Sequence, residues 1–177
     1  MFLDCKFIYF ICIYYTAKMS KLNKITKKRS MGNAKTRKNI TSSKSSVLRN
    51  FQREITVNFF EMLLLIKLFH WKTYSYATHK ATDELYSKFN ENMDKFIEVL
   101  LGKTGMRIDL TNKKQITLYD LSNTTQLIEK VNSFKGYLVN LTNNKAIKVM
   151  TNSDLLNIRD EMLGDMNQFL YLLSFNK

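Results

Sequence analysis

Proline is absent from this 177-residue sequence, and only five glycines occur in it. Both residues interrupt helices and mark turns, so a chain with so few of them favours long helices over a turn-rich β-fold. Hydrophobic residues make up 45% of the chain and aromatic residues 12%, which excludes disorder throughout. The length fits one domain with a substantial core, and we predict an all-α fold.

Cysteine is almost as scarce, since Cys5 and Cys12 are its only occurrences. The rest of the chain therefore lacks the thiols for a disulfide framework or a cysteine-ligated zinc site. Disulfides mark oxidising compartments, so the sequence favours a reducing one. The bias toward Asn, Lys, Ile and Tyr is typical of an AT-rich genome, such as that of a large DNA virus. We expect a cytoplasmic or virion-associated protein.

Acidic residues are missing from one long basic segment. Residues 17–50 contain eleven Lys and Arg and no Asp or Glu, whereas the chain from Phe51 onward has sixteen basic and fourteen acidic residues. Most of the formal net charge of +13 therefore belongs to an arm, and the body is nearly neutral. We predict an apolar N-terminal segment and a disordered basic arm in residues 1–46, and a folded body in residues 47–177.

The basic arm is predicted to bind the phosphates of DNA or RNA without sequence preference. The alternatives are a solvated tail and a targeting signal. The predicted nucleic-acid-binding residues are Lys18, Lys21, Lys24, Lys27, Lys28, Arg29, Lys35, Arg37 and Lys38.

The apolar segment Phe7–Ala17 has eleven residues, too few for a membrane-spanning helix, which needs about 20. Three interpretations remain: translation that starts later, at Met19 or Met31; a membrane anchor; or a secretion signal. The first is favoured, and we do not expect a membrane partner.

Four amphipathic segments occupy the body, at about residues 46–74, 78–101, 123–141 and from Asn152 or Ser153 onward. Gly102 is placed as the C-cap of the second segment, and Gln126 as the capping-box partner in the third. The connection between the second and third segments, residues 103–121, is long for a helical bundle. Four helices with one long middle connection predict a ferritin-like four-helix bundle. The predicted core stripes are Leu85, Phe89, Met93, Phe96 and Leu100 in the second helix, and Leu155, Ile158, Met162, Met166, Phe169 and Leu173 in the fourth.

A second stripe on the second helix carries His79, Asp83, Asp94 and Glu98. Successive helical residues turn by about 100°, which places these four side chains roughly 130° from the core stripe. His79/Asp83 and Asp94/Glu98 are both i,i+4 pairs, close enough to share a ligand. One imidazole and three carboxylates suit ferrous iron or another first-row divalent ion. The alternative is an ordinary solvated face opposite the core.

One ion cannot reach both pairs of the same helix. Eleven residues separate Asp83 from Asp94, which is about 16 Å at about 1.5 Å per residue. An antiparallel two-fold dimer would set His79 and Asp83 of one chain against Asp94 and Glu98 of the other. The sequence contains no Glu-x-x-His, the pattern that a di-iron centre inside a bundle requires, so we do not expect such a centre.

The stretch "LFHWKTYSYATHKATDELYSKFNENMDKFIEVLLG" resembles the Dps family, the ferritin-like DNA-binding proteins from starved cells. In that family a His-Trp closes the first helix and a second His opens the next, followed by Asp four residues on, Asp eleven further and Glu four further. Here the series is His70-Trp71, His79, Asp83, Asp94 and Glu98. The stretch "DEMLGDMNQFLYLLSFN" resembles the closing helix of the family, and the likeness covers roughly residues 51–177. Large DNA viruses are expected to carry divergent ferritin-like proteins of this sort.

The resemblance implies a hollow dodecamer of four-helix bundles built from two-fold dimers. It also implies that ferrous iron is bound between two subunits, oxidised to ferric iron, preferably by peroxide, and stored. By matched position His70, His79 and Asp83 come from one subunit, Asp94 and Glu98 from the other, and Trp71 lies beside the site. Several members bind DNA through a basic N-terminal arm.

One feature departs from the family. Nine positions separate the two histidines here instead of the usual twelve, and the Gly-Pro turn is missing. The turn is therefore tighter, and His70 has an alternative role as a buried core histidine with one backbone partner. The prediction is thus an iron-binding protein that is a ferroxidase candidate. The alternatives are a non-enzymatic ferritin-like packaging protein that has lost the iron site, and a membrane-tethered bundle.

Overall fold

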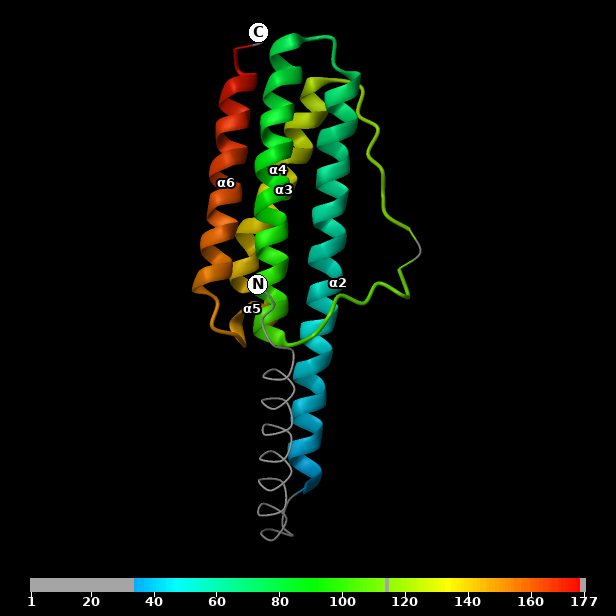
Figure 1. Ribbon diagram of the computed structural model, residues 1–177, viewed down its shortest axis with the longest axis vertical. Helices are drawn as coiled ribbons and strands as arrows, with labels where there is room; N and C mark the ends of the chain where they lie inside the picture. Colours follow the sequence, from blue (N-terminus) through cyan, green and yellow to red (C-terminus); the bar gives the residue numbers. More distant parts are fainter. Residues whose placement is uncertain (1–33, 114, 176–177) are drawn as a thin grey trace, which may run out of the picture. The chain divides into compact units, whose positions relative to one another are not determined.

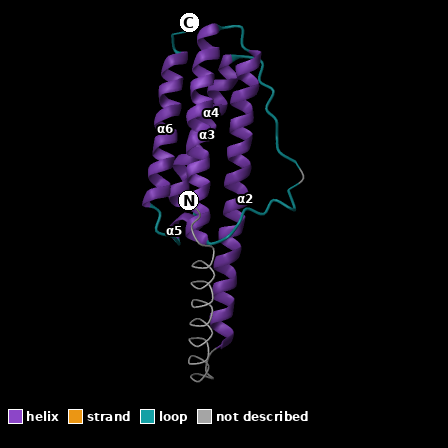
Figure 2. Cartoon of the chain, in the orientation of Figure 1, coloured by secondary structure: helices purple, strands orange, loops and turns teal. Residues whose placement is uncertain are grey.

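The computed structural model describes residues 34–113 and 115–175, and all regular secondary structure within them is helical (Figure 2). The chain divides into two units, residues 1–41 and residues 42–177. The described part of the first unit is helical. The long helices are α2 (Ala34–Lys72), α3 (Tyr76–Thr104), α4 (Thr124–Asn140) and α6 (Ser153–Leu173). Two short pieces, η1 (Leu141–Asn143) and α5 (Lys145–Lys148), join the last two. The predicted all-α class is confirmed.

The order of helix directions within residues 42–177 depends on the long middle connection. The tight turn after α2 reverses the chain into α3, and residues 105–123 then return along α2 before α4 begins (Figure 1). As a result α4 runs in the same direction as α3, and α6 runs opposite to both. The predicted long connection between the second and third bundle helices is therefore present.

The first bundle helix begins earlier than the sequence predicted. A start near Ser46, after a disordered arm, was expected, but α2 already includes residues 34–46. Lys, Arg and Ala are strong helix formers, and neither glycine nor proline occurs between Ala34 and Lys72 to interrupt the backbone. Basic charge alone does not prevent a helix. The remainder of the predicted arm, residues 1–33, and the apolar segment Phe7–Ala17 lie outside the described residues.

The end of α3 corrects the predicted C-cap. Gly102 lies inside the helix, and Gly105 terminates it with φ 65° and an N–H that donates to the Leu101 carbonyl at 2.9 Å. This left-handed conformation suits a residue without a Cβ. The expected cap of α4 is present: the Gln126 N–H donates to the Asn123 side chain at 3.0 Å, and the Gln126 side chain accepts from the Ser122 N–H at 2.8 Å.

Phenylalanine side chains at the centre of the core pack α2 against α3 and α4. Phe59 is fully buried, and its ring meets Phe89 and Phe96 of α3 edge-on at centroid distances of 5.8 and 5.4 Å. It also meets Phe134 of α4 at 6.3 Å. Both predicted core stripes are buried, except that Met93 is only partly buried. Edge-to-face rings of this kind add to the stabilisation that area burial gives.

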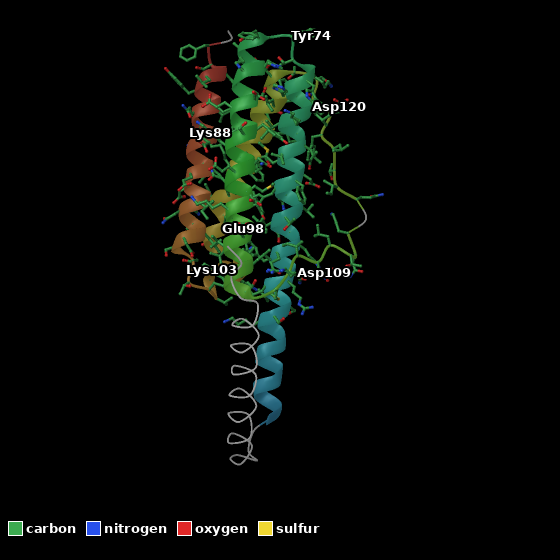
Figure 3. The ribbon with its side chains drawn as sticks, in the orientation of Figure 1. Tyr74, Lys88, Glu98, Lys103, Asp109 and Asp120 are labelled. Atoms are coloured by element: carbon green, nitrogen blue, oxygen red, sulfur yellow. The ribbon has the colours of Figure 1, made fainter. Side chains whose placement is uncertain are left out.

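Polar contacts hold α3 against α6 in one antiparallel register. Lys103 pairs with Asp154 at 2.7 Å and Lys95 with Glu161 at 3.4 Å. Nearer the other end of the seam, Lys88 donates to Gln168 at 2.9 Å. Figure 3 shows Lys103 and Lys88 at successive levels of this seam.

The returning connection is attached to α2 at three levels. Arg53 binds Asp109, the Thr117 N–H donates to Glu61 at 3.0 Å, and Lys72 pairs with Asp120. Residue numbers rise together on both sides, so the connection runs parallel to α2, and Asp109 and Asp120 mark its two ends in Figure 3.

Among the helices in the described residues, none is both long enough and apolar enough to cross a membrane.

Candidate metal site

The two histidines meet at the corner between α2 and α3. Their rings stack at a centroid distance of 3.9 Å with 23° between the planes. His70 is 7% exposed and His79 is half-buried. The tight turn, residues 73–75, folds the end of α2 directly onto the start of α3 and so creates this contact.

Each histidine bonds to the backbone of the other. His70 Nδ1 lies 3.1 Å from the His79 carbonyl oxygen, and His79 Nδ1 lies 3.0 Å from the His70 carbonyl oxygen. A carbonyl only accepts, so each Nδ1 carries the proton and donates it. In a neutral imidazole with this tautomer, Nε2 carries a lone pair. A metal-binding imidazole commonly has this arrangement, with the other nitrogen fixed by a carbonyl.

His70 is thus buried and bonded to one backbone carbonyl, as expected for a core histidine. Its Nε2, however, forms no hydrogen bond with the described residues. That atom lies 3.9 Å from Asp83 Oδ1, a carboxylate whose side chain is 51% exposed. The structure therefore brings His70, His79 and Asp83 to one corner.

Asp94 and Glu98 lie elsewhere on the same helix. Both are exposed, and no hydrogen bond or ion pair with other described residues involves either. Glu98 is far along α3 from the corner marked by Tyr74 in Figure 3. Within the described residues, no group of three or more His, Cys, Asp or Glu is placed to hold a metal ion. A single chain does not bring the five predicted residues together.

An apolar stripe on α2 lies beside this face of α3. Phe60 is 37% exposed, Leu64 38% and Trp71 69%. Lys67 links the two helices, with its Nζ 5.9 Å from the Trp71 ring and 4.5 Å from the Tyr86 ring. We call Phe60, Leu64 and Trp71 the α2 apolar stripe.

The stripe is level with the space between the two predicted pairs. Phe59 contacts Phe89 and Phe96, and Lys67 contacts Tyr86, so residues 60–64 lie level with the middle of α3. His79/Asp83 and Asp94/Glu98 flank that middle. The α2 apolar stripe is thus left partly uncovered within one chain.

One residue of the corner was not predicted from the sequence. Thr82 is fully buried; its Oγ1 lies 3.3 Å from His70 Nδ1 and 2.9 Å from the His79 carbonyl oxygen. Thr82 therefore helps to fix the His70 ring from the core side. A polar residue three positions before Leu85, close to the core stripe, was the available signal.

Residues 70–173 match a family described as Family of unknown function (DUF5856), which is more than half of the chain. The chain belongs to this family. No curated protein and no solved structure matches it. The DUF5856 match begins at His70 and ends at the last residue of α6, so it contains both histidines, the three carboxylates, and α3, α4 and α6. It leaves out the basic arm and nearly all of α2.

The predicted nucleic-acid-binding residues fall into two groups. Lys18, Lys21, Lys24, Lys27, Lys28 and Arg29 lie outside the described residues. Lys35, Arg37 and Lys38 belong to the first turns of α2.

Proposed function

We propose that this DUF5856 protein is a Dps-like, ferritin-like protein that binds ferrous iron as a substrate between two subunits and oxidises it, with peroxide as the favoured acceptor. The observation that carries the proposal is the histidine corner, where both Nδ1 atoms donate to carbonyls and the His70 Nε2 lies 3.9 Å from Asp83 Oδ1. Imidazole nitrogen with carboxylate oxygen suits ferrous iron.

The helix directions support the ferritin-like part. Bundles of that type have one long crossover connection, and residues 105–123 are such a connection between two helices that run the same way. The DUF5856 match covers this crossover and both of those helices.

Two neighbouring exposed surfaces support the dimer. They are the α3 face that carries the predicted ligands and the α2 apolar stripe. In an antiparallel pairing of α3 with its copy, His79 would lie level with the partner copy's residue 98, and Asp83 level with its residue 94. The α2 apolar stripe would then lie near the centre of the contact, where its burial supplies the association energy. Each dimer would hold two equivalent sites near its ends.

The chemistry asked of the protein is modest. Two ferrous ions each give one electron to one peroxide, which takes up two protons and leaves as two waters. The chain binds the ions, holds the imidazoles in one tautomer through the His70 and His79 carbonyls, and supplies carboxylates that favour the ferric product. Further subunits would assemble into a homo-oligomeric shell, for which a dodecamer is proposed, and the basic arm would bind DNA or RNA.

The test is anaerobic loading with Fe(II) followed by peroxide, with ferric absorbance as the readout. Wild type is expected to oxidise iron much faster than Asp94→Ala/Glu98→Ala. The matched control is Glu129→Ala/Glu161→Ala, which removes the same charge from exposed positions on α4 and α6 and should keep the wild-type rate. Equal slow oxidation by wild type and the Asp94/Glu98 variant would rule out the enzyme.

The second candidate is a non-enzymatic ferritin-like packaging protein, favoured by the acid-free basic segment of residues 17–50. It predicts salt-dependent DNA binding that is lost when residues 1–46 are deleted, with no metal bound.

A further inference from the structure

A basic pocket lies at the end of the bundle where α3 terminates. It has a volume of about 340 Å³ and lies between α2 and the chain that follows Gly105. Three arginines line it, Arg49, Arg53 and Arg107, together with one carboxylate, Asp109. Neither the histidine corner nor the predicted arm is part of it.

The fold gathers these arginines from two segments. Arg49 and Arg53 are one helical turn apart on α2 and so share a face. Opposite them, the left-handed Gly105 reverses the chain after α3 and brings residues 106–109 back toward α2. The buried Gln52 donates to Thr104 Oγ1 at 2.8 Å and fixes the distance between the two segments.

The only carboxylate of the pocket is already occupied. Arg53 donates to the Asp109 carbonyl and carboxylate, both at 2.8 Å. The Thr111 hydroxyl and N–H donate to the other carboxylate oxygen at 2.5 and 3.0 Å. These bonds lower the pKa of Asp109 to about 2, the Thr111 hydroxyl contributing most, so the carboxylate is ionised under ordinary conditions.

Two guanidinium groups are therefore left over. Arg49 and Arg107 are exposed, and neither forms an ion pair with another residue in the described part of the chain. Three arginines against one carboxylate give the pocket an excess of two positive charges. Arg49 and Arg107, which have no ion-pair partner among the described residues, point to an external anion.

We infer that this pocket binds a phosphate group, and that a phosphodiester of nucleic acid is its source. Planar guanidinium forks match phosphate oxygens, and contacts of this kind position a protein on a duplex without reading sequence. Nucleic acid is favoured over free phosphate because the chain before Arg49 is basic and contains no acid back to residue 17, so a polyanion can continue along it.

This inference extends the proposed function to a surface of the folded body and does not depend on iron. The experiment measures binding of a labelled duplex DNA to the full chain by fluorescence anisotropy over a series of salt concentrations. The variant is Arg49→Gln/Arg107→Gln. The matched control is Lys145→Gln/Lys148→Gln, which removes the same charge from two exposed lysines of α5.

Loss of the one phosphate contact should reduce the slope of log affinity against log salt by about 0.9, and lower the affinity by roughly tenfold near 0.1 M salt. The α5 control should keep the wild-type slope. Equal slopes for the two double variants would overturn the pocket and leave only a general charge effect.

Inorganic phosphate is the second probe. A phosphate-dependent rise in the Tm of wild type but not of the arginine variant, with DNA binding unchanged, would overturn the nucleic-acid assignment in favour of free phosphate. Iron oxidation by the arginine variant should equal that of wild type. A failure of the iron proposal is therefore separable from a failure of this one.

Discussion

A mixing experiment tests whether two chains share the candidate metal site. One variant is His79→Ala/Asp83→Ala and the other is Asp94→Ala/Glu98→Ala. Along α3 the two altered pairs are eleven residues apart, about 16 Å at about 1.5 Å per residue, so no single ion can contact both pairs of one chain. If sites form between subunits, each variant alone destroys both sites of its dimer.

The mixed dimer behaves differently. One of its sites combines both sets of substitutions, while the other combines the intact His79/Asp83 of one chain with the intact Asp94/Glu98 of its partner copy. Random re-pairing makes about half of the dimers mixed, each with one of two sites intact, so about a quarter of the wild-type activity should return.

The assay is iron oxidation after the two variants are unfolded together and refolded, with a mixture prepared without unfolding as the control. Circular dichroism checks that each variant is folded. If the first variant does not fold, Asp83→Asn alone replaces it, because Asp83 makes no hydrogen bond with the described residues. Activity equal to the mean of the separate variants would refute the shared site.

Three further predictions concern the fold. Phe59→Ala should reduce the free energy of unfolding, measured by urea denaturation, by about 3–5 kcal/mol, because a fully buried ring that contacts three other rings is lost. The control Val139→Ala, at an exposed site, should change this free energy by less than about 0.5 kcal/mol. Gly105→Ala should lower the free energy of unfolding by about 1–2 kcal/mol, because this position has a left-handed φ. Gly102→Ala, inside α3 with open space around its Cβ position, should raise the free energy of unfolding by about 0.5–1 kcal/mol. A change of the same sign for both variants would contradict the assignment of Gly105 as the cap. The pKa of Asp109 is about 2 in the folded protein, which is below its unfolded value. Its bonds to Thr111 and Arg53 therefore stabilise the fold fully above about pH 4, and this stabilisation is lost as the pH falls toward 2. In urea titrations between these pH values, the free energy of unfolding of Asp109→Asn should depend less on pH than that of the wild type.

Sequence periodicity predicted the helices better than their ends. Apolar spacing located α3, α4 and α6 to within about three residues, because burial of one face is written directly into a helix of 3.6 residues per turn. The start of α2 was missed, since a polar basic segment has no such periodicity. Gly102 was taken for the cap because it directly follows the last residue of the predicted helix, and only the backbone angle identifies Gly105.

The candidate site shows the same division. Spacing alone placed His79, Asp83, Asp94 and Glu98 on one face and required a second subunit for any shared ion. Spacing could not say whether His70 was a ligand or a core residue. The structure gives His70 features of both, because the short turn buries its ring and directs Nδ1 to a carbonyl while Nε2 is left beside Asp83.

By itself the sequence determined the all-helical class, the core stripes, the long middle connection and the location of basic charge, all of which follow from local residue order. The tertiary structure decided what depends on contacts between distant segments. Those contacts set the reciprocal bonds of the two histidines, the exposure of the α2 apolar stripe, and the convergence of Arg49, Arg53 and Arg107 in one pocket. The physical reason is that periodicity records which face of a helix is buried, whereas the partner of that face is fixed only when the chain reverses at residues 73–75 and at Gly105.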